Sequence, residues 1–211
     1  MRMILASASP RRRELLRVVG VPFRVIPSRI EEVPRPGEPP RRFVRRAARD
    51  KGAEVSARYP KAFVLSADTI VVAGGKILGK PADRGEAMRM LSLLAGRDHL
   101  VHTAVCLLRA DGGYRDETCE TTRVTFRRLT KEEIAAYLRT GESDDKAGAY
   151  AAQGAGNLLI ERISGSFTNV VGLPMTQTLS LLIRAGLLAV SRKGPAWYGY
   201  AREGPWHRRS R

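Results

Sequence analysis

The alternation of strand-like and helix-like segments along the chain most constrains its fold. Apolar, β-branched segments at 2–7, 22–28, 62–79 and 100–129 predict strands, and 148–165 predicts a glycine-rich turn that leads into another strand. Amphipathic segments at 9–20, 40–59, 83–96, 130–141 and 173–186 predict helices, several of them with N-cap and C-cap residues. This order predicts an α/β or α+β protein with a mixed sheet.

Length and composition predict one globular domain. The chain has 211 residues, of which 43% are hydrophobic and 27% are charged, and these values exclude a disordered protein. No apolar run is long enough to span a bilayer, and no secretory signal opens the chain, so we expect a cytoplasmic protein. Because 191–211 is rich in Gly, Pro and Arg without periodicity, we expect a domain at 1–190 and a basic, mobile tail at 191–211.

The formal net charge of +16 leaves two interpretations open. A strongly basic chain suits nucleic acid or a polyanionic small substrate. An arginine-rich, solvated surface would give the same charge without any such partner. Charge alone therefore does not identify what the protein binds.

Cysteine and histidine residues do not form a recognisable metal site. Cys106 and Cys119 have no Cys/His spacing typical of zinc, and His99 and His102 read as strand residues. A hairpin with Gly112-Gly113 as its loop would place Cys106 opposite Cys119. We expect two reduced thiols, as is usual for a cytosolic protein.

The stretch "LASASPRRREL" at 5–15 predicts an anion site. A short strand leads into a helix with Ser9 as N-cap and Pro10 as first residue, and Ser7 adds a second hydroxyl. Arginines at 11–13 are unfavourable for the positive end of the helix dipole, which suggests that a phosphate is expected there. The alternative is an ordinary Ser-Pro helix start with solvated arginines.

Acidic residues at two places are candidates for acid–base or metal chemistry. Asp68 interrupts an apolar strand, where a buried carboxylate needs partners, so it is a candidate general base or metal ligand. Glu31 and Glu32 lie in a Pro-rich loop, where paired acids can hold Mg²⁺ together with phosphate oxygens. Solvent-exposed carboxylates are the alternative for all three.

Two lysines and one glutamine complete the set of candidates. Lys51 and Lys80 are among the few lysines of an arginine-rich chain, and Lys80 precedes Pro81 in an extended segment from which it can reach a ligand. Gln153 lies in a glycine-rich turn, and its amide offers both a donor and an acceptor to a base edge. Surface lysines and a plain turn are the alternatives.

Taken together, these residues resemble the Maf family of nucleoside triphosphate pyrophosphatases. The resemblance covers about residues 3–186, and the motifs occur in the family's order: "LASASPRR", "IEE", "ARDKG", "SADTIV", "LGKP", "DKAGAYAAQG" and "GSFTNVVGLP". It implies an α/β fold with an elongated mixed β-sheet flanked by helices, and two lobes with a nucleotide cleft between them. Members of the family often form homodimers.

The resemblance also implies a reaction and a set of site residues. The reaction is hydrolysis of a nucleoside triphosphate to the monophosphate and pyrophosphate with a divalent cation, Mg²⁺ or Mn²⁺. By resemblance, the catalytic Asp is Asp68 and the acidic metal-binding position is Glu32. The phosphate-binding positions are Ser7, Ser9, Arg11, Arg12, Lys51 and Lys80.

Three positions separate the subfamilies. The subfamily that acts on dTTP and UTP has Arg after the Ser-Pro, Thr after the catalytic Asp and Gln in the glycine-rich turn, and this chain has Arg11, Thr69 and Gln153. The resemblance therefore implies a dTTP/UTP pyrophosphatase. Two alternatives stay open: a pyrophosphatase for non-canonical purine triphosphates such as ITP or XTP, and a basic nucleic-acid-binding regulator of cell division.

Overall fold

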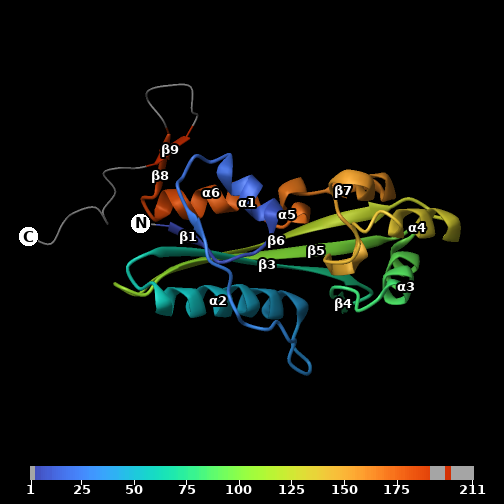
Figure 1. Ribbon diagram of the computed structural model, residues 1–211, viewed down its shortest axis with the longest axis horizontal. Helices are drawn as coiled ribbons and strands as arrows, with labels where there is room; N and C mark the ends of the chain where they lie inside the picture. The colour runs from blue at the N-terminus through green and yellow to red at the C-terminus, as the bar shows by residue number, and fades with distance from the viewer. Residues whose placement is uncertain (1–2, 191–197, 201–211) are drawn as a thin grey trace, which may run out of the picture.

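The computed structural model describes residues 3–190 and 198–200, and one seven-stranded mixed sheet runs along its length (Figure 1). The strands are β1 (Met3–Leu5), β2 (Arg24–Val25), β3 (Phe63–Ala73), β4 (Lys76–Leu78), β5 (Asp98–Arg109), β6 (Tyr114–Phe126) and β7 (Ile160–Ser164). Their order is β2-β1-β3-β5-β6-β7, with β4 also on β3. β1 is parallel to β2 and β3, and the other pairs are antiparallel, which confirms the predicted mixed sheet.

Helices cover both faces of this sheet (Figure 1). They are α1 (Pro10–Arg17), α2 (Pro40–Arg58), α3 (Arg84–Leu94), α4 (Lys131–Leu138), α5 (Phe167–Val171) and α6 (Met175–Arg184), with 3₁₀ turns η1 (Ala147–Ala149) and η2 (Gly154–Leu159). α2 lies on one face, and α1 and α6 lie on the other. Within the described ranges, each helix is too short or too polar to cross a bilayer.

Separate apolar cores occupy the two ends of the elongated sheet. At one end, Leu16 of α1 and Leu181 of α6 pack against β1 and β3. At the other end, Leu91 of α3 and Ile134 of α4 pack with Phe126 of β6. The α/β architecture with flanking helices is therefore confirmed, and each lobe has its own core.

The sheet has an opening along one edge of β3. β1 pairs with residues 63–65 of β3, and β4 pairs with residues 71–73 on the same edge. Within the described residues, no strand covers 66–70 between these two pairings. Asp68 and Thr69 lie in this uncovered stretch, so the gap leaves the middle of a largely buried strand without a neighbour on that edge.

The predicted register of the β5–β6 hairpin is wrong by two residues. Arg109 pairs with Tyr114, so the loop has four residues rather than the glycine pair alone. Cys106 therefore lies opposite Glu117, and Cys119 lies opposite Ala104. Both cysteines are free thiols, as expected. Burial raises the pKa of Cys106 to about 12, which keeps it protonated at neutral pH.

A short two-stranded sheet lies at the C-terminal end of the described chain. β8 (Leu188–Val190) pairs antiparallel with β9 (Tyr198–Tyr200). The predicted tail at 191–211 otherwise lies outside the described residues. The domain boundary at residue 190 stays a prediction.

The two histidines of β5 are sheet residues, as expected from the sequence. His99 is buried, and its Nε2 is 2.8 Å from the hydroxyl of Tyr150, while Phe126 packs edge-on against its ring. His102 Nδ1 is 2.8 Å from the hydroxyl of Thr121. Burial lowers the pKa of His99 to about 4, because a charged imidazole would lose its hydration there.

We expect His99 to make the protein less stable as the pH falls below 6.5. Between pH 6.5 and 4 the unfolded chain binds a proton at His99 that the folded protein does not, so the free energy of unfolding falls by at most about 1.4 kcal/mol per pH unit. His99→Gln removes this titration and should make the decline between pH 6.5 and 5 shallower. Denaturant unfolding at several pH values measures it, and an unchanged slope would contradict this assignment.

Candidate active site

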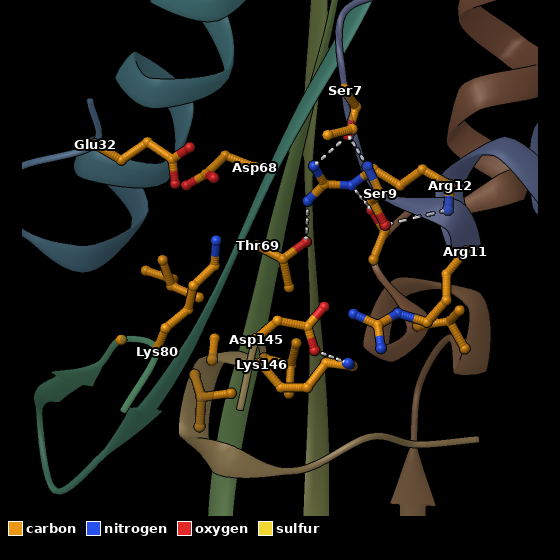
Figure 2. A pocket seen from close by; sticks show the side chains of 18 of the residues that line it. Ser7, Ser9, Arg11, Arg12, Glu32, Asp68, Thr69, Lys80, Asp145 and Lys146 are labelled. Carbon is orange, nitrogen blue, oxygen red and sulfur yellow. Dashed lines mark hydrogen bonds and ion pairs between the residues drawn. The ribbon is translucent and has the colours of Figure 1, made fainter. Parts of the chain in front are cut away.

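The sequence-predicted residues all line one cleft. The cleft has a volume of about 780 Å³, within the range of small-molecule sites. It lies at the opening beside β3 and receives side chains from the segments after β1 and β4 and from the loop before η1 (Figure 2). Its lining includes Ser7, Ser9, Arg11, Arg12, Glu32, Lys51, Asp68, Thr69, Lys80 and Gln153.

An acid–lysine–acid cluster lies at one end of the cleft. Lys51 Nζ donates to Asp68 Oδ1 at 2.8 Å and also forms an ion pair with Glu32. Glu32 and Asp68 point toward one another (Figure 2). The lysine cation therefore holds the two carboxylates together on the floor of the site.

The packing of α2 explains how Lys51 reaches this position. The buried residues of α2 recur every four positions, and Lys51 is the charged residue on that face. Gly52 lets the helix approach β3, because an added Cβ would lie 2.6 Å from Ser66 Oγ. A lysine in phase with an apolar helix face is the sequence signal that could have revealed this contact.

The two carboxylates of the cluster have opposite pKa shifts. Burial raises the pKa of Asp68, and the negative charge of Glu32 acts in the same direction, against the attraction of Lys51. Burial also acts to raise the pKa of Glu32, but the attraction and hydrogen bond of Lys51 outweigh it and lower that pKa. Asp68 is therefore the better proton acceptor of the two.

Arg12 is held by four oxygen atoms around its guanidinium group. Its Nε donates to the carbonyl of Gly172 at 2.8 Å, and one terminal nitrogen donates to the carbonyl of Ala67 at 2.8 Å and to Ser7 Oγ at 3.2 Å. The other terminal nitrogen donates to Thr69 Oγ1 at 2.9 Å. Burial lowers the pKa of Arg12, and the negative charges of Asp68 and Glu32 oppose this shift. One N–H of its five remains available to a ligand.

Side chains, more than backbone amides, supply the donors at the start of α1. The Ser9 side chain caps Arg12 N as predicted, and Pro10 has no N–H. Ser7 Oγ accepts from Ser9 N and from Arg12, and its proton has no acceptor among the described residues. The Ser7 hydroxyl and the last Arg12 N–H are therefore free to bind an anion.

A chain of hydroxyl groups fixes the orientation of Thr69. Thr103 Oγ1 donates to the carbonyl of Asn169 at 3.0 Å and lies 2.9 Å from Thr69 Oγ1. Because that carbonyl can only accept, Thr103 must accept from the Thr69 hydroxyl, and Thr69 in turn accepts from Arg12. The only hydroxyl proton of Thr69 is thus used inside the protein. Sequence reasoning missed Thr103, because buried threonines are common in strands. Asn169 lies in the motif "GSFTNVVGLP", but it was given no role from the sequence.

A second charged group lies at the opposite side of the cleft. Arg11 points toward Asp145 and Lys146, and Lys146 donates to Asp145 (Figure 2). Burial lowers the pKa of Arg11, and the charge of Asp145 opposes this shift. Lys80 extends into the cleft from the segment after β4, and its charge contributes to the low pKa of Glu32. Asp145 and Lys146 begin the motif "DKAGAYAAQG" of the resemblance, but neither was given a role from the sequence.

Gln153 projects from the glycine-rich turn between η1 and η2. It is exposed at the cleft wall, and its backbone is extended with φ −110°. The amide is therefore free to meet a ligand.

The amino-acid sequence is similar to that of known proteins along most of the described chain. The model of the family described as Maf-like protein matches residues 2–185. The chain belongs to the Maf-like family. Among its relatives, the dTTP/UTP pyrophosphatase of Cereibacter sphaeroides is 50% identical over 188 residues, which are 89% of this chain and 96% of the relative.

Two further relatives carry the same description. The dTTP/UTP pyrophosphatase of Myxococcus xanthus is 49% identical over 185 residues, 88% of this chain and 93% of the relative. The protein of that description from Syntrophomonas wolfei is 46% identical over 182 residues, 86% of this chain and 96% of the relative. The similarity therefore extends over all elements that build the cleft.

Proposed function

We propose that this Maf-like protein hydrolyses dTTP and UTP to the nucleoside monophosphate and pyrophosphate. One observation carries the proposal: a single cleft contains three groups suited to this reaction. They are the buried carboxylate of Asp68 beside Lys51, the guanidinium group of Arg12 held by four oxygen atoms, and the side-chain amide of Gln153. Relatives described as dTTP/UTP pyrophosphatases support it. Nothing in the cleft favours a purine-specific enzyme or a nucleic-acid-binding regulator.

The triphosphate would lie along the donors at the start of α1. Ser7 and Arg12 line the cleft and each have one proton without an acceptor among the described residues, and Arg11 and Lys80 add positive charge to the lining. These groups are partly desolvated, so their attraction to phosphate is stronger than it would be in water. Fixed donors of this kind also need little rearrangement as negative charge develops on the leaving pyrophosphate.

The carboxylates fit a divalent cation. Glu32 and Asp68 already converge on one positive group, the ammonium of Lys51, and oxygen donors of this kind suit Mg²⁺ or Mn²⁺ together with phosphate oxygens. No group of three His, Cys, Asp or Glu side chains that could hold a metal occurs in residues 3–190 and 198–200. A cation held by Glu32 and Asp68 would neutralise charge on the phosphates.

Asp68 would act as the general base. Its raised pKa brings it closer to that of a useful base, and its hydrogen bond to Lys51 fixes its orientation. Asp68 takes a proton from water while the water oxygen bonds to the α-phosphorus. The bond from that phosphorus to the β-phosphate oxygen breaks, pyrophosphate leaves, and Asp68 then returns the proton to solvent.

Gln153 would recognise the base. Thymine and uracil present carbonyl oxygens and an N3–H, and an amide can donate to the former and accept from the latter. Thr69 has no free proton, so its contribution to preference acts through Arg12 or through its remaining lone pair.

A nucleotide panel tests the proposal. The purified protein is incubated with dTTP, UTP, CTP and ITP in Mg²⁺ or Mn²⁺, and pyrophosphate and orthophosphate are both measured. We expect pyrophosphate from dTTP and UTP, and little turnover after chelation of the cation. Preference for ITP would favour a purine house-cleaning enzyme, and release of orthophosphate would contradict the proposed reaction.

Two substitutions at Thr103 test whether its hydroxyl group, through Thr69, keeps Arg12 in position. We expect Thr103→Val to lower kcat/KM for dTTP about tenfold, because Thr69 loses its acceptor and the Arg12 contact loosens. Thr103→Ser keeps the hydroxyl and should retain near-normal activity, although it too loses some stability through the missing methyl group. Equal activity of the two variants would contradict this role.

A homodimer and a cytoplasmic location are also part of the proposal. The homodimer rests on the family resemblance, and the location is the expectation drawn from the sequence. Sedimentation of the purified chain tests the first, and cell fractionation tests the second.

A further inference from the structure

Glu142 binds the glycine-rich turn that carries Gln153. Its Oε1 accepts from Ala155 N at 3.0 Å, and its Oε2 accepts from Gly156 N at 3.0 Å. Both carboxylate oxygens are thus used on two consecutive amides. Hydrogen bonds of this charged kind are stronger than those between neutral groups.

Tyr137 binds the other end of the same turn. Its hydroxyl oxygen accepts from Ala151 N at 3.1 Å. Tyr137 is a buried residue of α4, and burial raises the pKa of its hydroxyl to about 12, so it remains neutral. The segment from Ala151 to Gly156 is therefore fixed at both ends from α4 and the turn after it, and Gln153 lies between the two contacts.

Two glycines make the fit between Glu142 and the turn close. Gly154 has φ +70°, and an added Cβ would lie 3.0 Å from Glu142 Cδ and also collide with its Oε1. At Gly156 an added Cβ would collide with the carbonyl oxygen of Ala151. The turn therefore packs closely against the Glu142 carboxylate and against its own backbone, and neither Gly154 nor Gly156 has room for a side chain.

We propose that Glu142 sets the nucleotide preference by positioning Gln153. Glu142 is not among the residues that line the cleft, so it reaches the site through the turn and through the attraction of its charge for Arg11, which would act alike on the phosphates of every nucleotide. The inference rests on the proposed function and adds to it a residue outside the cleft. In this proposal, the side-chain amide of Gln153 binds the base only while the Glu142 carboxylate holds the backbone N–H groups of Ala155 and Gly156.

Glu142→Gln is the discriminating variant. The amide keeps one acceptor but places an NH₂ group against a backbone N–H, so one of the two contacts becomes unfavourable. We expect kcat/KM for dTTP and UTP to fall about tenfold, while kcat/KM for CTP and ATP changes less than about twofold. Glu161→Gln, which removes the same charge from an exposed residue of β7, should leave all four values unchanged.

A double-mutant cycle shows whether the effect passes through Gln153. In a Gln153→Ala background, Glu142→Gln should produce little further loss for dTTP, because the group that it positions is already absent. An equal proportional loss for all four nucleotides, or a full additional loss in this background, would overturn the proposal and leave the proposed function standing.

Amide exchange tests the contact without any nucleotide. Glu142→Gln should raise hydrogen exchange at Ala155 and Gly156 and leave β5 unchanged. Unchanged exchange at these two amides would also overturn the proposal. If the wild-type protein instead releases no pyrophosphate from any nucleotide, the proposed function fails, and the assignment of nucleotide preference fails with it.

Discussion

Asp68→Asn should reduce turnover of dTTP by at least about 100-fold, the usual contribution of a general base. Asn is nearly the same size but cannot take a proton from the attacking water. Burial already raises the pKa of Asp68, so the folded protein gains little from that charge, and Lys51 keeps its ion pair with Glu32. We therefore expect the variant to fold, and steady-state kinetics with a thermal unfolding curve measures both properties.

Asp111→Asn is the matched control for this variant. Asp111 lies in the exposed β5–β6 loop, where it accepts from Arg109, and we expect the change to leave turnover intact. A well-folded Asp68→Asn protein with near-normal turnover would show that Asp68 is not the base.

Arg12→Lys should lower both stability and activity. A lysine has one ammonium group and cannot reach the carbonyls of Ala67 and Gly172 together with Ser7 and Thr69. Unpaired carbonyls in this partly buried position should lower the free energy of unfolding by about 2 to 4 kcal/mol. Loss of an oriented donor to the phosphates should lower kcat/KM for dTTP by about 100-fold or more.

Arg17→Lys separates this effect from a general loss of guanidinium groups. Arg17 is exposed at the end of α1, and we expect its replacement to change stability by less than about 0.5 kcal/mol. Denaturant unfolding and kinetics on both variants measure the difference. If Arg12→Lys retained wild-type stability and activity, the four contacts would have no role in the site.

Local sequence signals predicted many of the elements. Ser9 caps α1, and Thr130 and Glu133 form the predicted capping box of α4, because these contacts depend only on neighbouring residues. The hairpin was predicted, but its predicted register is wrong, since the glycine pair does not reveal that Ala110 and Asp111 also belong to the loop.

The contacts within the site could be predicted only in part. The resemblance indicated which residues would line the cleft, and the cleft contains them. It did not indicate that Lys51 binds both Glu32 and Asp68, or that Thr103 fixes the hydroxyl of Thr69. These contacts join segments far apart in the chain: Lys51 reaches Asp68 because α2 packs against β3, and Thr103 reaches Thr69 because the two residues are paired across β3 and β5.

The most direct measurement is hydrolysis of dTTP in water enriched in heavy oxygen. We predict one pyrophosphate for each dTMP, with the heavy oxygen in dTMP, because water attacks the α-phosphorus beside Asp68. Release of orthophosphate, or heavy oxygen found in the pyrophosphate instead, would contradict this account of the cleft.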